Sequence, residues 1–536
     1  MKADYSAFYF IRSFLIFRRK FLEVNMRFER SAGILLHPTS LPGRFGIGDM
    51  GSEAYNFVNF LEAAGQRLWQ VFPLGPTGYG DSPYQCFSAF AGNPLIISPE
   101  KLFEKGFLSA EDLNNSIHSD HHKIDYGAVI NYKKTLLKKS FENYKKNHNG
   151  VKESFDEFCG QNKIWLEDYA FFMAAKDYHG GVVWTQWDKG LVHRDESALK
   201  SWQKKLADEI LYYKFIQFQF FEQWKELRAY ANDKGIKIIG DMPIFIAYDS
   251  ADLWAHKELF TVDSEGSLET VAGVPPDYFS ETGQLWGNPL YRWKVMEQDD
   301  FLWWRQRFAQ LFEMIDIIRI DHFRGFDAYW EIPGTATTAQ TGRWVKAPGE
   351  KLFLTVKKYL GELPIIAEDL GVITKSVTEL RERLSFPGMK IMQFAFGTNM
   401  ERKFLPHNYV QNCMVYTGSH DNDTTRAYFE KEKNNGTDIY THAQKYLNYY
   451  GNDVVAQLIR AAYASVADVV VIPMQDILNL GGEARMNFPG TLGGNWTWRF
   501  TWDQVPHHLA QYYKELAALY ERPPEPEKVV EIETEE

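Results

Sequence analysis

Three acidic residues stand just after short apolar runs at widely separated places in the chain. Asp321 and Glu368 follow their runs at once, and Asp421 comes after four intervening residues. The runs are residues 317–320, 365–367 and 414–416. Such runs, rich in β-branched residues and ending abruptly in charge, are typical of parallel strands that are buried on both faces. Two or three carboxylates that converge at the ends of such strands are the groups that cleavage of a glycosidic bond requires.

Five further segments show the same pattern, which brings the candidate strands to eight. They are residues 33–37, 68–72, 236–241, 389–394 and 468–473. Amphipathic helical stretches lie between several candidates, for example residues 52–64, 218–232 and 376–384. Strands that alternate with helices predict an α/β protein with a parallel sheet, and eight strands favour a closed (β/α)8 TIM barrel with its chemistry at the carboxyl ends. An open doubly wound sheet is the alternative.

Composition favours one large soluble enzyme. The 536 residues leave room for insertions, since barrels run from about 250 to beyond 400 residues. With a net charge of −11, the chain lacks the excess of basic residues that is typical of nucleic-acid-binding proteins. The three cysteines, Cys86, Cys159 and Cys413, have no metal-ligand spacing, so we expect no disulfide framework, metal or other cofactor, and a cytoplasmic location. The aromatic content of 16% exceeds what we expect of a core alone and suits a protein on which sugar rings stack.

The two ends of the chain do not fit the barrel pattern. In residues 1–25, Arg12 separates two short apolar runs, and three basic residues follow them. The apolar stretch is too short to span a bilayer, and its charges lie on the wrong side for a signal peptide. We interpret this segment as an added or mis-started leader, with a basic surface-attachment helix as the alternative. Residues 523–536 are predicted to be a solvated acidic tail. No transmembrane segment is expected.

Residues 26–522 are therefore predicted to form the catalytic barrel, with two insertions too long for ordinary connections. The first, at about 76–230, is polar and helical and is expected to form a mostly helical subdomain over the carboxyl-terminal face of the barrel. The second, at about 246–310, includes residues 273–289, whose Gly, Pro and aromatic residues predict an ordered loop at the rim of the site.

Seven motifs, taken in their order along residues 33–499, carry a family resemblance. They are Gly-Asp-Ser-Pro-Tyr-Gln at 80–85, Gly-Asp-Met-Pro-Ile at 240–244, the loop 273–289, Arg-Ile-Asp-His-Phe-Arg-Gly at 319–325, Ala-Glu-Asp-Leu-Gly at 367–371, His-Asp-Asn-Asp-Thr at 420–424 and Arg-Met-Asn at 485–487. The chain resembles the 4-α-glucanotransferases, the amylomaltase or disproportionating enzyme family. This resemblance implies transfer of α-1,4-glucan segments from a donor to an acceptor among maltooligosaccharides, starch or glycogen.

The acids by themselves would serve a retaining α-glucan hydrolase of the amylase type equally well. That hydrolase is the nearer alternative, and a metal-dependent barrel hydrolase is a more distant one. Nothing in the sequence indicates an oligomeric state.

The resemblance also implies roles for the acids: Asp321 as nucleophile, Glu368 as acid/base and Asp421 as stabiliser of the transition state. For Asp321, Arg319 shares its face of the strand and would keep the carboxylate ionised, although a structural ion pair is the alternative. For Glu368, apolar neighbours would raise the pKa, as a proton donor requires. A place in the start of the next helix is the alternative, and Asp369 fits that role better. The choice of Asp421 over Asp423, which could cap a helix, rests on the resemblance alone.

Further residues are implied to contact substrate. They are Ser82, Tyr84, Asp241, Asp277, Gln284, Trp286, Arg319, His420 and Asn487. For Tyr84 and Trp286, ordinary packing is the alternative, because aromatic side chains also fill cores.

We predict that residues 1–25 are dispensable, because they precede the first strand and contain no barrel element. A chain that begins at Met26 should match the full chain in melting temperature and in turnover. A marked loss of either property would show that the leader packs onto the enzyme.

Overall fold

The computed structural model describes residues 28–114, 117, 120–276, 280–397, 402–451, 453–491 and 493–522. The expectations for the leader 1–25, for the tail 523–536 and for Asp277 therefore lie outside the described residues.

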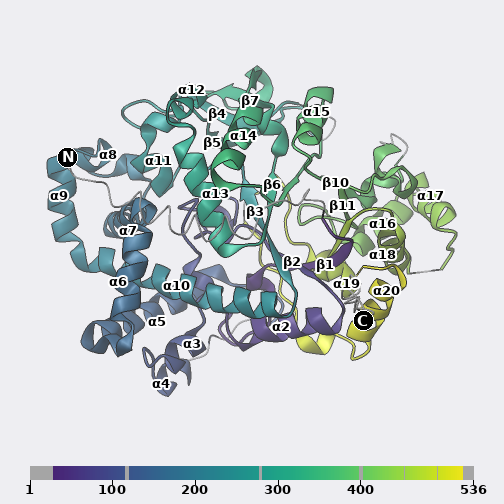
Figure 1. Cartoon of the computed structure of the whole chain (residues 1–536), viewed down its shortest axis with the longest axis horizontal. Helices are drawn as coiled ribbons and strands as arrows, with labels where there is room; N and C mark the ends of the chain where they lie inside the picture. The colour runs from purple at the N-terminus through teal and green to yellow at the C-terminus, as the bar shows by residue number, and fades with distance from the viewer. Residues whose placement is uncertain are drawn as a thin grey trace, which may run out of the picture.

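Eight parallel strands close into a barrel in the order β1-β12-β11-β10-β9-β6-β3-β2 (Figure 1). The strands are β1 (Ser31–Leu35), β2 (Leu68–Gln70), β3 (Lys237–Pro243), β6 (Ile317–Asp321), β9 (Ile365–Ala367), β10 (Gly388–Ile391), β11 (Cys413–Tyr416) and β12 (Val469–Pro473). Each predicted strand segment overlaps one of them. The closed (β/α)8 barrel is thus confirmed, and the open sheet is wrong.

Nearly every residue of the barrel strands is buried, as a sheet covered by helices outside and filled by side chains inside requires. Close approach between strands restricts the sequence at Gly33 in β1. A Cβ atom there would lie 2.4 Å from the carbonyl oxygen of Leu68 in β2, so no larger residue fits. The first and last strands pair in register from Ser31 with Val469 to Leu35 with Pro473, which closes the barrel.

Helices surround the barrel and build the insertions. They are α2 (Ser52–Ala63), α3 (Pro99–Glu104), α4 (Ala110–Asn114), α5 (Tyr126–Asn147), α6 (Lys152–Gln161), α7 (Lys163–Tyr178), α8 (Lys189–Val192), α9 (Glu196–Lys205), α10 (Ala207–Asp233), α11 (Ala251–Ala255), α12 (Trp293–Met296), α13 (Leu302–Met314), α14 (Gly349–Leu360), α15 (Lys375–Arg383), α16 (Thr425–Asn434), α17 (Asp438–Leu447), α18 (Val454–Ala464), α19 (Met474–Ile477) and α20 (Leu509–Leu519). The predicted helical stretches 52–64, 218–232 and 376–384 fall in α2, α10 and α15.

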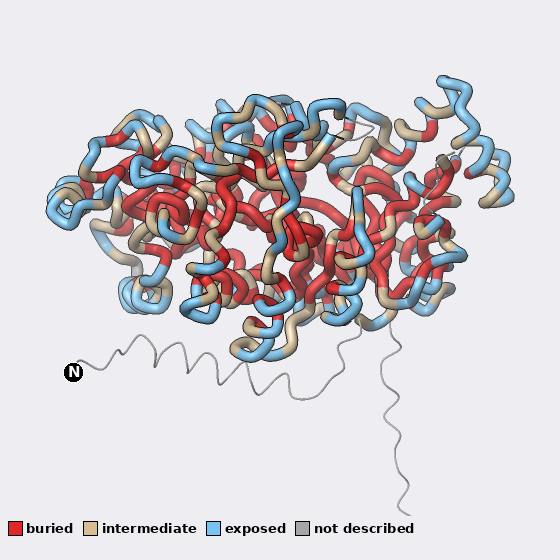
Figure 2. The backbone as a smooth tube through the Cα atoms, turned by 90° about the horizontal axis from the view of Figure 1, so that it is seen from above, coloured by how far each residue is buried: buried red, intermediate tan, exposed pale blue. Residues whose placement is uncertain are grey.

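The first insertion is helical and is joined to the barrel by a shared core. Helices α3 to α9 form one side of the molecule, and the long helix α10 returns from them to the barrel (Figure 1). Gln217 and Gln223 of α10 are buried and accept hydrogen bonds from the backbone N–H groups of Gly92 (2.8 Å) and Ser98 (2.7 Å). One hydrophobic cluster runs through the insertion and the barrel, and Figure 2 shows this continuous buried interior.

A second, antiparallel sheet lies at the barrel rim, and the sequence did not predict it. Its strands are β4 (Thr270–Val274), β5 (Gln284–Pro289), β7 (Ala328–Pro333) and β8 (Arg343–Lys346), in the order β5-β4-β7-β8. Residues 273–274 and 284–289 of the segment that was expected to be a loop therefore belong to strands. The pairing is non-local, because β4 and β5 precede β6 whereas β7 and β8 follow it, and Val271 packs on Ile332 across the two segments.

Two arginines join the ends of the described chain at the amino-terminal side of the barrel. Arg522 is fully buried, and its guanidinium donates to the carbonyl oxygens of Ser31 (3.1 Å) and Tyr463 (2.8 Å). Arg30 donates to the carbonyl oxygens of Ser465 and Tyr463, at the carboxyl-terminal end of α18. Cations are favoured at this end of a helix because the free carbonyl groups there carry partial negative charge.

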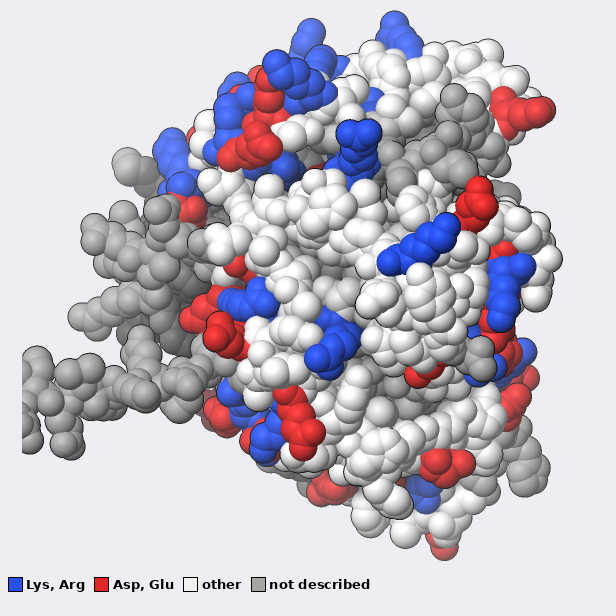
Figure 3. Space-filling view, turned by 90° about the vertical axis from the view of Figure 1, so that its right-hand side faces the viewer, with Lys and Arg blue, Asp and Glu red and all other residues white. Residues whose placement is uncertain are grey.

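The face that α16 to α18 and α20 form carries few charges, and its basic residues are interspersed with acids (Figure 3). None of the helices in the described part of the chain has both the length and the apolar composition needed to cross a membrane.

Candidate active site

A buried ion pair stands at the centre of the barrel mouth. Asp241 on β3 and Arg319 on β6 are register partners, and both are buried. Arg319 Nη1 lies 2.5 Å from Asp241 Oδ2 and 3.1 Å from Asp321 Oδ1. Burial lowers the pKa of Arg319, but the attraction of the two carboxylates outweighs it, so this pKa lies well above its usual value. The predicted neighbourhood of Arg319 and Asp321 is confirmed, and the guanidinium orients the acid.

Tyr84 joins this centre from the connection after β2. Its hydroxyl donates to Asp241 Oδ2 at 2.8 Å. Burial, opposed by Arg319, raises the pKa of Asp241 to about 6. The second oxygen, Asp241 Oδ1, is buried and has no hydrogen-bond partner among the described residues. An unpaired buried acceptor is costly, and a sugar hydroxyl could donate to it.

Glu368 stands directly after β9 and accepts two backbone hydrogen bonds. Its oxygens receive the N–H groups of His322 and Leu370, each at 2.8 Å. These bonds favour the ionised form, yet burial and the nearby charge of Asp321 outweigh them and raise the pKa of Glu368 to about 8. This carboxyl group is therefore protonated at neutral pH, and the neighbouring Asp321 accepts a hydrogen bond from the Arg319 guanidinium.

His322 is a site residue that the sequence reasoning missed, although the motif 319–325 contains it. It has a left-handed backbone conformation, with φ of 52°, and this turn follows Asp321 at the end of β6. Its N–H holds Glu368, and its buried Nε2 has no hydrogen-bond partner within the described residues. Burial lowers the pKa of His322 to about 4, so the ring is neutral. Strained residues of this kind cluster at active sites.

Asp421 lies across the barrel mouth from Asp241, on the connection after β11. Its side chain is half exposed, and Asn487 Nδ2 donates to its Oδ1 at 2.7 Å. Nε2 of the buried His420 lies 3.4 Å from the same oxygen. Arg485, also missed by the sequence reasoning, donates to the carbonyl oxygen of Asp421 at 3.1 Å. The predicted site residues Asp421, His420 and Asn487 therefore do lie together.

A column of four rings supports His420 and Tyr84. His37 stacks on Phe72 with ring centroids 5.1 Å apart, Phe72 packs on His420 at 4.9 Å, and His420 stacks on Tyr84 at 5.2 Å. Trp496 packs beside Phe72, His420 and Tyr84. This column links the connections after β1, β2 and β11, and it holds the side chains that flank Asp421 and Asp241.

The remaining predicted contacts lie at the rim. Trp286 on β5 packs edge-on against His322 at 4.9 Å, and its Nε1 donates to Gln284 Oε1 at 3.1 Å. Trp286 thus lies beside the residue that follows the nucleophile candidate. The non-local pairing of β4 with β7 brings it there. Ser82 Oγ accepts from the N–H of Tyr84 at 3.2 Å and so shapes the turn that presents Tyr84.

Neither of the neighbouring acids has the helix-capping role that the sequence suggested. Asp369 accepts from the N–H of Met389 at 2.7 Å and pairs with Arg381 at 3.2 Å, and α15 begins after Thr374. Asp423 accepts from the N–H of Thr424, whose own side chain caps α16. Asp369 therefore fixes the loop after Glu368, and Asp423 supports the loop of Asp421.

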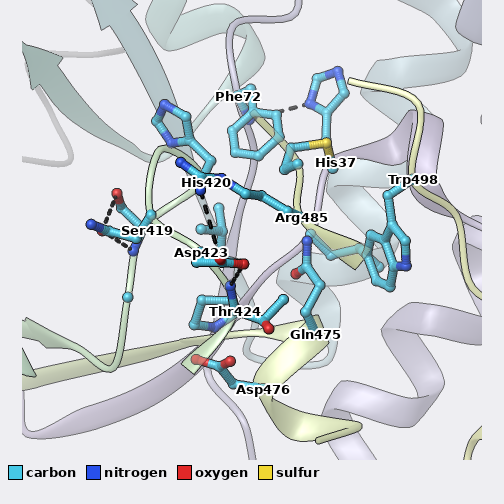
Figure 4. A pocket seen from close by; sticks show the side chains of 16 residues that line it. His37, Phe72, Ser419, His420, Asp423, Thr424, Gln475, Asp476, Arg485 and Trp498 are labelled. Carbon is cyan, nitrogen blue, oxygen red and sulfur yellow. Dashed lines mark hydrogen bonds and ion pairs between the residues drawn. The ribbon is translucent and has the colours of Figure 1, made fainter. Parts of the chain in front are cut away.

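A cavity opens beside the Asp421 connection, on the side of the mouth opposite β6 and β9 (Figure 4). His37, Phe72 and His420 line its upper part, and Asp423 points toward Arg485 across it (Figure 4). Within the described residues, no group of three His, Cys, Asp or Glu side chains is arranged to hold a metal ion.

Comparison with known proteins identifies the class. The family model described as 4-alpha-glucanotransferase matches residues 36–504. The chain is 48% identical over 502 residues to the 4-alpha-glucanotransferase of Synechocystis sp., covering 92% of this chain and 98% of the relative. It is 49% identical over 496 residues to that of Thermus thermophilus, covering 91% and 98%. The amylomaltase from Streptococcus agalactiae, solved in complex with acarbose, superposes with a TM-score of 0.89 at 42% identity, covering 92% of this chain and all of that one.

The barrel and its rim of acids are thus those of a glycosyl-transferring enzyme. The chain belongs to the 4-α-glucanotransferase (amylomaltase) family and transfers glucan segments. The resemblance drawn from the sequence motifs is confirmed, and the hydrolase alternatives are wrong.

Glu368→Gln should lower kcat/KM on maltotriose by about 10²- to 10⁴-fold, because the leaving sugar oxygen loses its proton donor. Cleavage of α-glucosyl fluoride should suffer much less, since fluoride leaves without a proton. In the wild type, kcat/KM should fall as pH rises through about 8, where Glu368 loses its proton. Glu379→Gln, at an exposed acid on α15, is the matched control. An alkaline fall that persists unchanged in Glu368→Gln would contradict the assignment.

Proposed function

We propose that this 4-α-glucanotransferase works by a retaining double displacement. Asp321 attacks the anomeric carbon of the donor while Glu368 gives its proton to the departing glucan oxygen. The C1–O bond breaks, and a covalent glucosyl-enzyme forms on Asp321. Glu368, now ionised, removes the proton from an acceptor hydroxyl, whose oxygen displaces Asp321 from C1. The α-linkage is re-formed, and both carboxyl groups return to their starting states.

The observation that carries this proposal is the contrast between the surroundings of two neighbouring carboxyl groups. The guanidinium of Arg319 donates to Asp321 Oδ1 at 3.1 Å, whereas burial raises the pKa of Glu368 to about 8. A retaining mechanism needs one ionised nucleophile and one protonated acid at the start of the reaction. The cation beside Asp321 and the burial of Glu368 support these two proposed roles.

The other site residues are proposed to bind the donor sugar at the cleaved bond. Asp421, oriented by Asn487, would stabilise positive charge that develops on the sugar ring. The free oxygen of Asp241 could accept a hydrogen bond from a sugar hydroxyl, and the free Nε2 of His322 could donate or accept one according to its tautomer. Because these atoms are held before substrate arrives, little reorganisation is needed when the bond breaks.

Transfer rather than hydrolysis requires that an acceptor sugar be held and that water be excluded from the intermediate. Trp286 is proposed to stack on the acceptor, with Gln284 beside it and Asp277 from the same segment. Its place against His322 puts it close to the site of the covalent intermediate. The proposed donors and acceptors are α-1,4-glucans, namely maltooligosaccharides, starch or glycogen.

We also propose a reducing, cytoplasmic setting for the reaction. Cys86, Cys159 and Cys413 are all free thiols in the structure, as reducing compartments favour. Relatives from Solanum tuberosum and Arabidopsis thaliana carry names that place those proteins in plastids.

Asp321→Asn should abolish transfer between maltotriose molecules and leave the melting temperature nearly unchanged, because an amide of the same shape cannot form the covalent bond. The check is a chromatogram of products from maltotriose together with thermal unfolding. Asp327→Asn, an acid after the same strand that pairs with Lys346, is the control that should keep its activity. More than a few percent of wild-type turnover in pure Asp321→Asn would rule out this nucleophile.

Trp286→Ala should raise free glucose relative to redistributed maltooligosaccharides, because a weaker acceptor site admits water to the intermediate. Formation of the intermediate from α-glucosyl fluoride should be less affected. Trp344→Ala, at the opposite edge of the same sheet, is the matched control and should keep the wild-type ratio. If the ratio stays constant in Trp286→Ala while intermediate formation collapses, Trp286 serves the donor site through His322.

A further inference from the structure

Both ends of the connection that carries Asp421 are held by one carboxylate. The connection runs from Thr417, directly after β11, to Thr425, the first residue of α16. Asp476 Oδ2 accepts from Thr417 Oγ1 at 2.5 Å and from Thr425 Oγ1 at 2.6 Å. Asp476 Oδ1 accepts from the N–H of Thr425 at 2.8 Å. Three donors from the two ends of the connection therefore converge on a single side chain.

Asp476 belongs to a different part of the barrel. It lies on α19, the short helix after β12, and its exposed fraction is 3%. Figure 4 shows it beneath Thr424 and Gln475, at the base of the cavity that the Asp421 connection borders. Burial raises its pKa, and the three hydrogen bonds oppose that rise. A buried acid with every oxygen occupied has no free atom for substrate, so its influence must pass through the residues that it binds.

Gln393, after β10, extends the network beneath the connection. Its backbone N–H donates to the carbonyl oxygen of Thr417 at 3.2 Å, and its Nε2 donates to Thr425 Oγ1 at 3.1 Å. Thr425 Oγ1 thus accepts from Gln393 and donates to Asp476. The chain of hydrogen bonds fixes the direction of each hydroxyl, and such networks hold a single arrangement when every member is satisfied.

Capping of α16 does not explain these contacts. The cap is Thr424, whose side chain accepts from the N–H of Ala427. The bonds to Asp476 are additional, and they set the separation of Thr417 from Thr425. Between these two points the chain must form a loop that presents His420 and Asp421 to the mouth. Asn487 and Arg485 then bind Asp421 from the connection that follows α19, so both sets of contacts come from the segment after β12.

We propose that Asp476 is a positioning residue, which places Asp421 for its action in the transition state by closing the connection 417–425 at both ends. This inference rests on the role proposed above for Asp421. A displacement of about 1 Å at such a group can cost about 100-fold in rate. The effect should fall on kcat, because Asp421 is proposed to act on charge that develops only as the bond breaks.

The test is Asp476→Asn, assayed with maltotriose. An amide nitrogen cannot accept, so at least one of the three donors loses its partner although the shape is kept. We expect kcat to fall about 10- to 100-fold, with KM changed by less than about threefold. Asp112→Asn is the matched control: this acid is also buried, accepts from the N–H and hydroxyl of Ser109 at 2.8 Å each, and lies in the first insertion. It should change melting temperature without changing kcat.

A double-mutant comparison separates positioning from a general structural role. In an Asp421→Asn background, with α-glucosyl fluoride as donor, adding Asp476→Asn should change the rate by less than about twofold, because the group to be positioned is already absent. Thr417→Val, which removes one donor with little change of shape, should show a smaller fall in kcat than Asp476→Asn. That fall should likewise disappear in the Asp421→Asn background. It provides the test if Asp476→Asn does not fold.

Each outcome decides the proposal. Equal losses from Asp476→Asn in both backgrounds, or a loss confined to KM, would overturn it. An unchanged kcat in Asp476→Asn, with Asp421→Asn impaired, would overturn the positioning role and leave the role of Asp421 standing. Full activity of Asp421→Asn would overturn the role of Asp421 and the positioning role together.

Discussion

The buried pair of Arg319 and Asp241 is the constraint on which the site depends. Desolvation makes such pairs poor sources of stability, but removal of one partner leaves an uncompensated charge and costs about 3–5 kcal/mol. In this site the pair matters because it fixes the positions of the side chains around it. The two residues are register neighbours on β3 and β6, so the barrel fixes the guanidinium, which in turn orients Asp321 while Asp241 receives Tyr84. Any shift of these strands would move Asp321 and its supports together.

Two influences act on the pKa of Glu368 in opposite directions: burial raises it, and hydrogen bonds from the backbone lower it. Hydrogen bonds from His322 and Leu370 hold the carboxyl group in place, and alone they would keep it ionised. Burial is the larger influence, so the group is held rigidly and still keeps its proton. The left-handed turn at His322, just after β6, makes this possible. It directs the N–H of His322 toward Glu368, which follows the neighbouring barrel strand β9. One strained residue thereby couples the positions of both acids.

The sequence was sufficient for the barrel and for the places of the three acids after β6, β9 and β11, because buried parallel strands are local apolar runs that these acids follow. It was insufficient where position depends on distant partners. The pairing of β4 with β7, which brings Trp286 onto His322, has no local signal. The same holds for Asp476, whose neighbours in sequence give no hint of Thr417. Asp369 shows the opposite kind of error. Its place in the sequence suggested that it starts a helix, but in the structure it accepts a hydrogen bond from the N–H of Met389.

The pairing of the first strand with the last has a consequence for synthesis in the cell. Ser31 meets Val469, so β1 has no partner on that side until residue 469 has left the ribosome. At about 5–20 residues per second, that wait is on the order of tens of seconds. During it, β1 presents an unpaired edge, and the ring column on His37 lacks the Asp421 connection that completes it. A nascent chain therefore completes the barrel mouth only after its eighth barrel strand, β12, has been synthesised.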